Sequence, residues 1–194
     1  MFLIDASGSV KRTNFEKQMD FVKDFVRSLT IGPNADLVGV TAFSTLPRNP
    51  VWMNSHTEKN NLLAAIDNIP YPGGSSHTEH ALKFARLQAF TTKYGDRADV
   101  PNVLILLTDG QSTVPTETVK EAELVHKAGI TVYAVGIGNT IDMSELQMIA
   151  SSPDKVLSVA NFDALQNILA DLEKATGCSG GGPLTTTVLP ETTT

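Results

Sequence analysis

Two serines follow an aspartate at alternating positions near the start of the chain. Residues 2–5 (FLID) form a short apolar run that ends in Asp5, and Ser7 and Ser9 come at the next alternate positions. A carboxylate with two hydroxyls at this spacing can ligate a cation through oxygen atoms. In isolation the same pattern also suits an Asx turn and helix caps, so further oxygen ligands must decide between the two interpretations.

Further oxygen ligands occur at two other places. Asp109 comes directly after NVLILLT (102–108), an apolar run typical of a central parallel strand, and Thr78 ends the polar loop GGSSHT (73–78). In an open α/β sheet, ligands bind beyond the carboxyl ends of the strands, where the strand order reverses. If residues 2–5 and 102–108 are neighbouring strands, two carboxylates and three hydroxyls meet there. Such a set suits Mg²⁺, with Mn²⁺ or Ca²⁺ as alternatives, and leaves one coordination position for an outside ligand.

The elements that must position these residues alternate along the chain. Apolar runs of strand length are separated by segments with helical spacing, which predicts an α/β fold with a mostly parallel sheet and helices on both faces. Thr13 and Glu16 fit a capping box at the start of the first helix, and Asp142 and Glu145 are placed to cap a later one. The predicted strands are residues 2–5, 36–43, 49–54, 102–108, 130–137 and 155–160. The predicted helices are residues 14–29, 57–69, 78–92, 116–128, 142–150 and 161–175.

Composition argues against several classes of function. The 194 residues carry a net charge of −6, from 15 basic and 21 acidic residues, and 41% of them are hydrophobic. A mildly acidic chain without a lysine or arginine cluster is not expected to bind nucleic acid or an anionic membrane. No stretch approaches the roughly 20 apolar residues of a membrane span, so no membrane insertion is expected. The chain also lacks the G-x-x-x-x-G-K-[ST] pattern of a phosphate-binding loop.

At three motifs the sequence resembles the von Willebrand factor type A domain of the extracellular-matrix and adhesion type. DASGS (5–9) matches the family's DxSxS motif, GGSSHTEHAL (73–82) resembles its GG…T-G-x-A-L segment, and LLTDG (106–110) matches the motif of its second aspartate. The resemblance covers residues 1–178. It implies a Rossmann-like, doubly wound sheet of six strands, one of them an antiparallel edge strand.

The resemblance also implies a metal-ion-dependent adhesion site. Carried over to this chain, its hydroxyl ligands are Ser7, Ser9 and Thr78, while Asp5 and Asp109 coordinate Mg²⁺ directly or through water. The open coordination position would take an acidic side chain from an extracellular protein ligand, such as collagen or another matrix protein. Because the cation bridges two anionic groups, binding is expected to vanish without it.

The residues around Thr78 depart from the family's pattern. Glu79 stands where the family often has glycine, and a third carboxylate there would either raise the affinity for the cation or obstruct an acidic ligand. His77 and His80 flank Thr78, but a site of hydroxyls and carboxylates needs no imidazole. We therefore interpret the two histidines as a solvated loop residue and a helix-surface residue.

The ends of the chain are those expected of a piece of a longer secreted protein. In the family the first strand usually has several more residues, often with a cysteine shortly before it. Cys178 stands where the second member of that cysteine pair would be, so the resemblance implies a disulfide to a cysteine outside this sequence. After the domain at 1–178, residues 179–194 are rich in glycine, proline and threonine and predict a disordered linker.

Two other functions stay open at the level of sequence. A structural module of matrix assembly could keep the metal site without using it, and binding that persists in a chelator would favour that role. A metal-assisted hydrolase would need a base near a bound water, and only His77 offers one. Because no G-x-S-x-G elbow is present, an enzyme is the less favoured interpretation.

Overall fold

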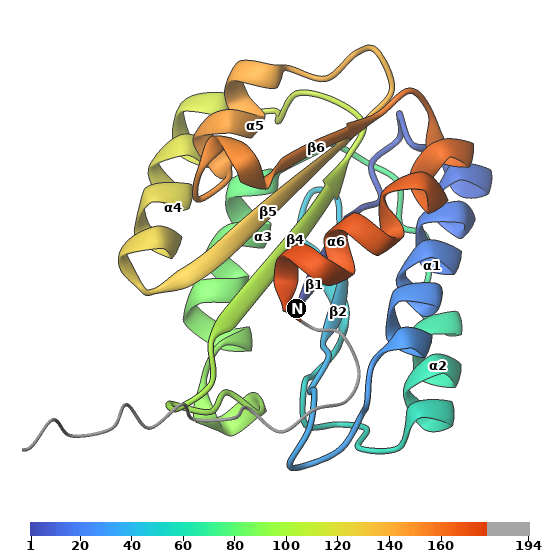
Figure 1. Cartoon of the computed structure of the whole chain (residues 1–194). Helices are drawn as coiled ribbons and strands as arrows, with labels where there is room; N and C mark the ends of the chain where they lie inside the picture. Colours follow the sequence, from blue (N-terminus) through green and yellow to red (C-terminus); the bar gives the residue numbers. More distant parts are fainter. Residues whose placement is uncertain (178–194) are drawn as a thin grey trace, which may run out of the picture.

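A six-stranded sheet runs through the centre of the molecule in the order β3-β2-β1-β4-β5-β6 (Figure 1). The computed structural model describes residues 1–177. Neighbouring strands are parallel except β2 and β3, which are antiparallel. The predicted mostly parallel sheet with one antiparallel edge strand is therefore confirmed. The strands are β1 (Phe2–Asp5), β2 (Val40–Phe43), β3 (Pro47–Val51), β4 (Asn102–Thr108), β5 (Ile130–Ile137) and β6 (Val156–Val159).

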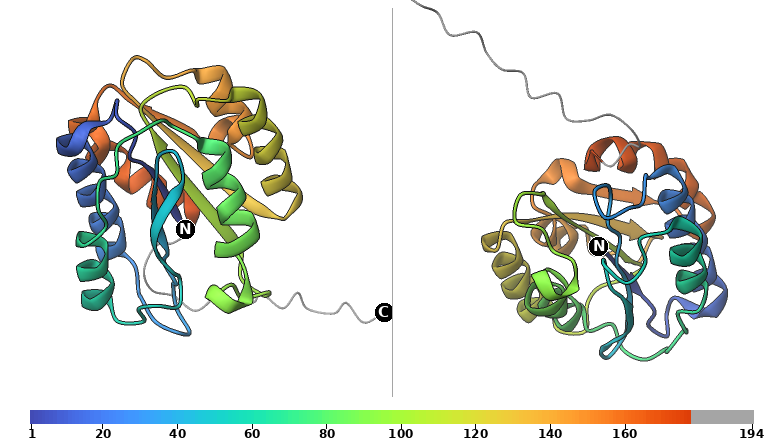
Figure 2. Two further views of the ribbon diagram at one scale, coloured as in Figure 1. Left: turned by 180° about the vertical axis from the view of Figure 1, so that it is seen from behind. Right: turned by 90° about the horizontal axis from the view of Figure 1, so that it is seen from below.

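Helices cover both faces of this sheet, which makes the fold doubly wound (Figures 1 and 2). On one face lie α1 (Lys11–Ser28), α2 (Lys59–Asp67) and α6 (Leu169–Thr176). On the other lie α3 (Thr78–Phe84), α4 (Pro115–Lys127) and α5 (Met143–Ile149). Shorter helical turns are η1 (Ala85–Ala89), η2 (Thr92–Tyr94), η3 (Pro153–Lys155) and η4 (Phe162–Ile168).

β1 can lie at the centre of the sheet because both of its faces are apolar. Phe2 and Ile4 belong to the core that includes the buried residues of α1, and Leu3 belongs to the core of the opposite face. β1 pairs in parallel with β2 on one side and with β4 on the other. The predicted neighbourhood of residues 2–5 and 102–108 is thus confirmed, and the strand order reverses between these two strands.

The first helix begins earlier than predicted, and the predicted capping box is wrong. α1 starts at Lys11, so Thr13 and Glu16 lie inside the helix. Lys11 has a left-handed backbone conformation with φ of 63°, which turns the chain sharply from the loop after β1 into the helix. This turn sets the start of α1, since no side chain among the described residues caps it.

Four further elements differ from their predicted form. β3 spans Pro47–Val51 and not residues 49–54. β2 begins only at Val40, and Asp36 forms an isolated bridge with Ile31. The predicted helix 78–92 is α3 followed by the π-helical turn η1. The predicted helix 161–175 is the 3₁₀ segment η4 followed by α6.

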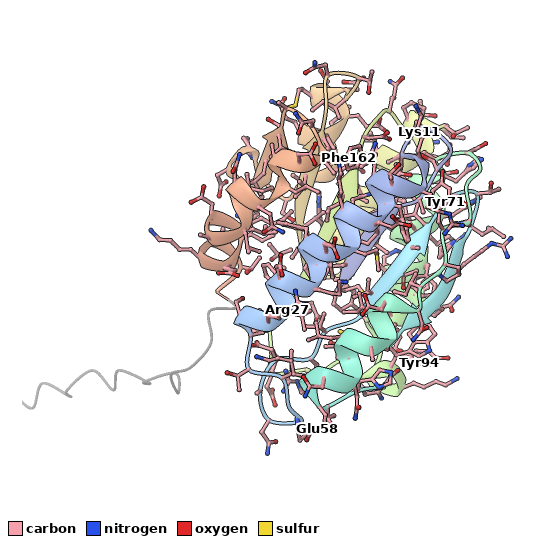
Figure 3. All side chains as sticks on the ribbon, turned by 90° about the vertical axis from the view of Figure 1, so that its right-hand side faces the viewer. Lys11, Arg27, Glu58, Tyr71, Tyr94 and Phe162 are labelled. Atoms are coloured by element: carbon pink, nitrogen blue, oxygen red, sulfur yellow. The ribbon has the colours of Figure 1, made fainter. Side chains whose placement is uncertain are left out.

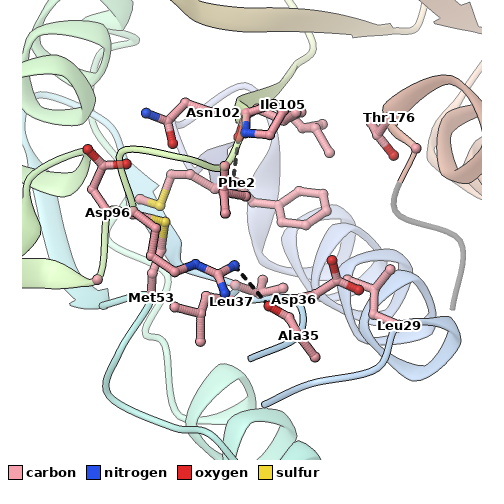
Figure 4. Close-up of a pocket in the computed structure, with 18 of the residues that line it drawn as sticks. Phe2, Leu29, Ala35, Asp36, Leu37, Met53, Asp96, Asn102, Ile105 and Thr176 are labelled. Carbon is pink, nitrogen blue, oxygen red and sulfur yellow. Dashed lines mark hydrogen bonds between the residues drawn. The ribbon is translucent and has the colours of Figure 1, made fainter. Parts of the chain in front are cut away.

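A cavity of about 730 Å³ lies at the edge of the sheet where β1 and β4 begin (Figure 4). Phe2, Leu29 and Met53 supply part of its apolar lining. Arg97 also lines it and donates a hydrogen bond of 2.8 Å from Nη2 to the carbonyl oxygen of Ala35. None of the residues predicted to bind metal lines this cavity, which lies at the opposite end of the strands.

Within residues 1–177, no helix combines the length and the apolar character that crossing a membrane requires. Cys178 and residues 179–194 lie outside the described residues. The disulfide and the linker therefore stay predictions.

Candidate functional site

The loops that follow β1 and β4 meet the loop before α3 at the carboxyl edge of the sheet, the upper end in Figure 1. The backbone N–H of Gly8 donates to the carbonyl oxygen of Gly74 at 2.8 Å, which joins the first loop to the loop before α3. The N–H of Thr113 donates to the carbonyl oxygen of Ser76 at 2.7 Å, which joins the loop after β4 to the same segment. Backbone hydrogen bonds thus bring together the three segments that carry the predicted ligands.

Asp5 is fully buried at the centre of this arrangement, and three donors fix its carboxylate. The backbone N–H of Ser7 donates to Oδ1 at 2.9 Å. The hydroxyls of Ser76 and Thr108 both donate to Oδ2 at 2.8 Å. Asp5 therefore holds its own loop, the loop before α3 and the end of β4 in one place.

Ser7, Ser9 and Asp109 form a chain of hydrogen-bonded oxygen groups. The two serine hydroxyls lie 3.0 Å apart, and the Ser9 hydroxyl donates to Asp109 Oδ1 at 2.9 Å. Burial raises the pKa of Asp109 above its ordinary value, the hydrogen bond from Ser9 opposes the rise, and the charge of Asp5 adds to it. Neither Asp5 nor Asp109 forms a salt bridge with a lysine, arginine or histidine of residues 1–177.

Thr78 is joined to the other four predicted ligands less directly. It is the first residue of α3 and is 2% exposed. Its hydroxyl has no hydrogen bond to the other four in the described part of the chain, and Ser76, two residues earlier, makes the contact with Asp5. The structure therefore links Asp5, Ser7, Ser9 and Asp109 through a network of hydrogen bonds and places Thr78 at the adjoining helix start.

Two further side chains hold the loop after β1, and sequence reasoning missed both. Gln18 of α1 donates from Nε2 to the carbonyl oxygen of Asp5 at 3.0 Å. The Tyr71 hydroxyl donates to the carbonyl oxygen of Ser7 at 2.9 Å. Figure 3 shows Tyr71 at the same end of the molecule as Lys11, where α1 begins. Gln18 carried a signal, because it is a polar residue among the apolar positions that α1 buries.

A buried carboxylate also supports the loop after β4. Glu145 of α5 is 3% exposed, and its Oε2 accepts a hydrogen bond of 3.0 Å from the Ser112 N–H. The Ser112 hydroxyl donates to the other oxygen of Glu145 and accepts from the Thr118 hydroxyl at 2.9 Å. This network fixes the loop that carries Asp109 against α4 and α5.

The histidines beside Thr78 make contacts that the sequence did not predict. His77 is not a freely solvated loop residue, since its Nδ1 lies 2.7 Å from Glu79 Oε1 and its side chain is 21% exposed. His80 is a surface residue as predicted, with 42% of its side chain exposed. Its Nδ1 lies 2.9 Å from the carbonyl oxygen of Thr45.

A doubly wound α/β sheet with a cluster of carboxylate and hydroxyl side chains at its switch point is typical of ligand-binding domains. The chain matches the family model of the von Willebrand factor type A domain over residues 1–171. It therefore belongs to this family, as its three motifs predict.

Matrix proteins are among its relatives. The chain is 37% identical over 185 residues to the collagen alpha-1(XII) chain of Notophthalmus viridescens, across 94% of this chain and 20% of that protein. It is 32% identical over 181 residues to matrilin-1 of Gallus gallus, across 90% of this chain and 36% of that protein. The chain thus spans only a minor part of the length of these relatives.

A solved structure shares the fold. It is described as proximal thread matrix protein 1 from the mussel byssus with a zinc-occupied MIDAS motif. The TM-score is 0.79 and the sequence identity is 32%, over 90% of this chain and 44% of that chain. A metal ion thus occupies the MIDAS motif of a protein that shares this fold.

Proposed function

We propose that the domain binds a divalent cation and, through it, an acidic side chain of an extracellular matrix protein. Mg²⁺ is the first candidate for the cation, with Mn²⁺ and Ca²⁺ as alternatives. The proposed ligands are Asp5, Ser7, Ser9, Thr78 and Asp109.

One observation carries this proposal, namely two buried carboxylates without a compensating positive charge. Asp5 is 0% exposed and Asp109 is 9% exposed, and no cationic side chain of the described residues pairs with either. Burying unpaired charges is costly, so a buried pair of this kind calls for an ion. The five side chains proposed as ligands offer carboxylate and hydroxyl oxygens, which is the donor set of a hard cation such as Mg²⁺.

The residues of the site would have two roles, to position the ligands and to bind the cation. Ser76, Thr108 and the Ser7 N–H hold the Asp5 carboxylate, so that the Ser7 and Ser9 hydroxyls are already oriented before a cation arrives. When bound, the cation would supply the positive charge that lets an acidic ligand approach this anionic edge.

Thermal unfolding tests cation binding first. A cation that binds only the folded state at about 100 times its Kd adds about 2.7 kcal/mol of stability. We expect Mg²⁺ to raise the Tm of the chain above its value in EDTA, and Asp109→Ala to abolish the rise. Asp99→Ala, which removes an exposed carboxylate at the other end of the molecule, should keep it. No rise in a folded wild-type sample would reject the cation site.

The family context supports a matrix protein as the partner and an extracellular location. The relatives include a collagen chain and matrilin-1, and the mussel protein is described as a thread matrix protein. These names support a secreted domain that binds collagen or another matrix protein. We expect the chain to bind immobilised matrix proteins in Mg²⁺ and to lose that binding in EDTA.

Two alternative functions, a structural module and a hydrolase, predict different results. Matrix binding that is equally strong in EDTA would favour a structural module whose metal site is unused. A hydrolase is not supported, because no serine hydroxyl of residues 1–177 is hydrogen-bonded to a histidine ring. We expect no turnover of generic ester and phosphate substrates.

A further inference from the structure

A second cluster of side chains that can ligate a metal lies at the start of α3, on residues that flank Thr78. His77, Glu79 and His80 each offer one ligand atom, and these atoms lie within 4.8 Å of one another. We propose that these three residues form a second metal site, for Zn²⁺, with a fourth coordination position open to water or to a partner's side chain.

The spacing of the three side chains supports this site. His77 Nδ1 lies 2.7 Å from Glu79 Oε1, and His80 Nε2 lies 3.9 Å from the same oxygen. Ligands of a tetrahedral zinc ion with bonds of 2.0–2.1 Å are about 3.3 Å apart. The two distances lie on either side of that value, so small side-chain movements would complete the geometry. The imidazole rings are already nearly parallel, at 18°, with centroids 5.1 Å apart.

Glu79 supplies a second observation that points to a ligand. Its side chain is 12% exposed, and its Oε2 is a buried oxygen without a hydrogen-bond partner in the described part of the chain. Glu79 forms no ion pair with a lysine or arginine of residues 1–177. A buried carboxylate oxygen that lacks a partner costs free energy, and a metal ion bound by both oxygens of Glu79 would offset that cost.

Backbone carbonyl oxygens contact the ring of His80 and the main chain of His77. His80 Nδ1 lies 2.9 Å from the carbonyl oxygen of Thr45, which fixes a proton on Nδ1 and leaves Nε2 with its lone pair on the side of Glu79. A metal-bound histidine commonly donates its other ring N–H to a backbone carbonyl in this way. The backbone N–H of His77 donates to the carbonyl oxygen of Ser44 at 2.9 Å. The turn between β2 and β3 therefore holds both histidines.

The donor set selects a different metal from the one proposed for the first site. Two imidazoles and one carboxylate suit Zn²⁺, which takes three protein ligands and one open position in many sites. The Asp5 cluster offers only oxygen and suits Mg²⁺. The second site shares no proposed ligand with the first, so each can be tested by its own substitutions.

Zinc titration of the full chain tests the proposal. The background should carry Asp109→Ala and Cys178→Ser, so that neither the first site nor the thiol takes up zinc, and should contain excess Mg²⁺. We expect calorimetry to show one equivalent of Zn²⁺ bound, and His80→Ala to weaken the affinity by at least about tenfold. His56→Ala, which removes a histidine outside the cluster, should leave the affinity unchanged.

A second measurement leaves the three proposed zinc ligands unchanged, so a folding defect caused by their substitution cannot affect it. In this background, Zn²⁺ should shift the imidazole NMR resonances of His77 and His80 and leave those of His56 and His126 in place. Resonances of His77 and His80 that do not move would overturn the proposal. So would an affinity for zinc that His80→Ala leaves unchanged.

Discussion

At the scale of single residues, hydroxyl groups donate hydrogen bonds to the Asp5 carboxylate. One of these hydroxyls belongs to a threonine, and valine can replace it with nearly the same shape. Thr108→Val takes away one of the two hydroxyls that donate to Asp5 Oδ2, at a position that is 3% exposed. We expect the free energy of unfolding in EDTA to fall by about 1–3 kcal/mol, because a buried acceptor loses a partner. Urea denaturation measures the change.

A second threonine provides a matched control. Thr41 of β2 is fully buried, and its hydroxyl has no partner among the described residues. Thr41→Val should therefore raise the free energy of unfolding by about 1 kcal/mol, since it removes an unsatisfied buried polar group. Equal losses in both variants would show that the replacement itself, and not the hydrogen bond to Asp5, is the cause.

Asp36 gives a test that depends on pH. Burial raises the pKa of Asp36 above its ordinary 3.8, against a backbone hydrogen bond from Thr30 and the charge of Arg97, which both lower it. The folded state therefore holds this proton more tightly than the unfolded chain does, and stability falls as pH rises through the window above 3.8. Asp36→Asn removes this contribution.

Chemical denaturation across that window measures the effect. The stability of Asp36→Asn minus that of the wild type should increase as pH rises and then level off above the raised pKa. A difference that stays constant with pH for Asp36→Asn would contradict the raised pKa.

The sequence predicted some residues around the site better than others. Asp5 and Asp109 could be predicted because each directly follows an apolar strand. Ser76 could not, because GGSSHT presents two adjacent serines and only the path of the backbone decides which one reaches Asp5. The pairing of His77 with Glu79 was missed for a similar reason, since it depends on side-chain directions at a helix start.

At the scale of elements, those that follow from a local sequence pattern were predicted well, and those that depend on packing were not. β4 and β5 match the predicted 102–108 and 130–137, because buried parallel strands are continuous apolar runs. The cap of α5 by Asp142 is also confirmed, since its side chain accepts hydrogen bonds from the N–H groups of Ser144 and Glu145. The predicted capping role of Glu145 is wrong, because its carboxylate accepts from Ser112 instead. The turn η1 could not be predicted, because its i→i+5 hydrogen bonding depends on packing and not on a local pattern.

α2 offers a test of helix capping. Glu58 precedes this helix with an extended backbone, φ −113° and ψ 128°, and its side chain makes no capping hydrogen bond. Glu58→Asp keeps the charge but shortens the side chain to one that can accept from the first turn. We expect the free energy of unfolding to rise by about 0.5–1 kcal/mol. Glu58→Gln, which keeps the length and cannot cap, should not produce this rise.

At the scale of the whole molecule, the proposed cation site joins segments that are far apart in the chain. The hydrogen bond from Ser9 to Asp109 spans 100 residues. A cation held by both segments would therefore restrain the loops at the carboxyl edge of the sheet. The loops at the other edge, around the cavity lined by Leu37 and Arg97, take no part in the site.

Hydrogen exchange of backbone amides, compared between Mg²⁺ and EDTA, tests this division. Amides of the sheet exchange through global unfolding, so Mg²⁺ should slow them by the same free energy that raises the Tm. We expect residues 6–10 and 109–114 to exchange through local opening, and Mg²⁺ bound at the proposed site should slow this exchange. Residues 95–101 also open locally but lie at the other edge, and their exchange should not change. Slower exchange at 95–101 together with unchanged exchange at 6–10 and 109–114 would place the cation away from Asp5 and Asp109 and reject the proposed site.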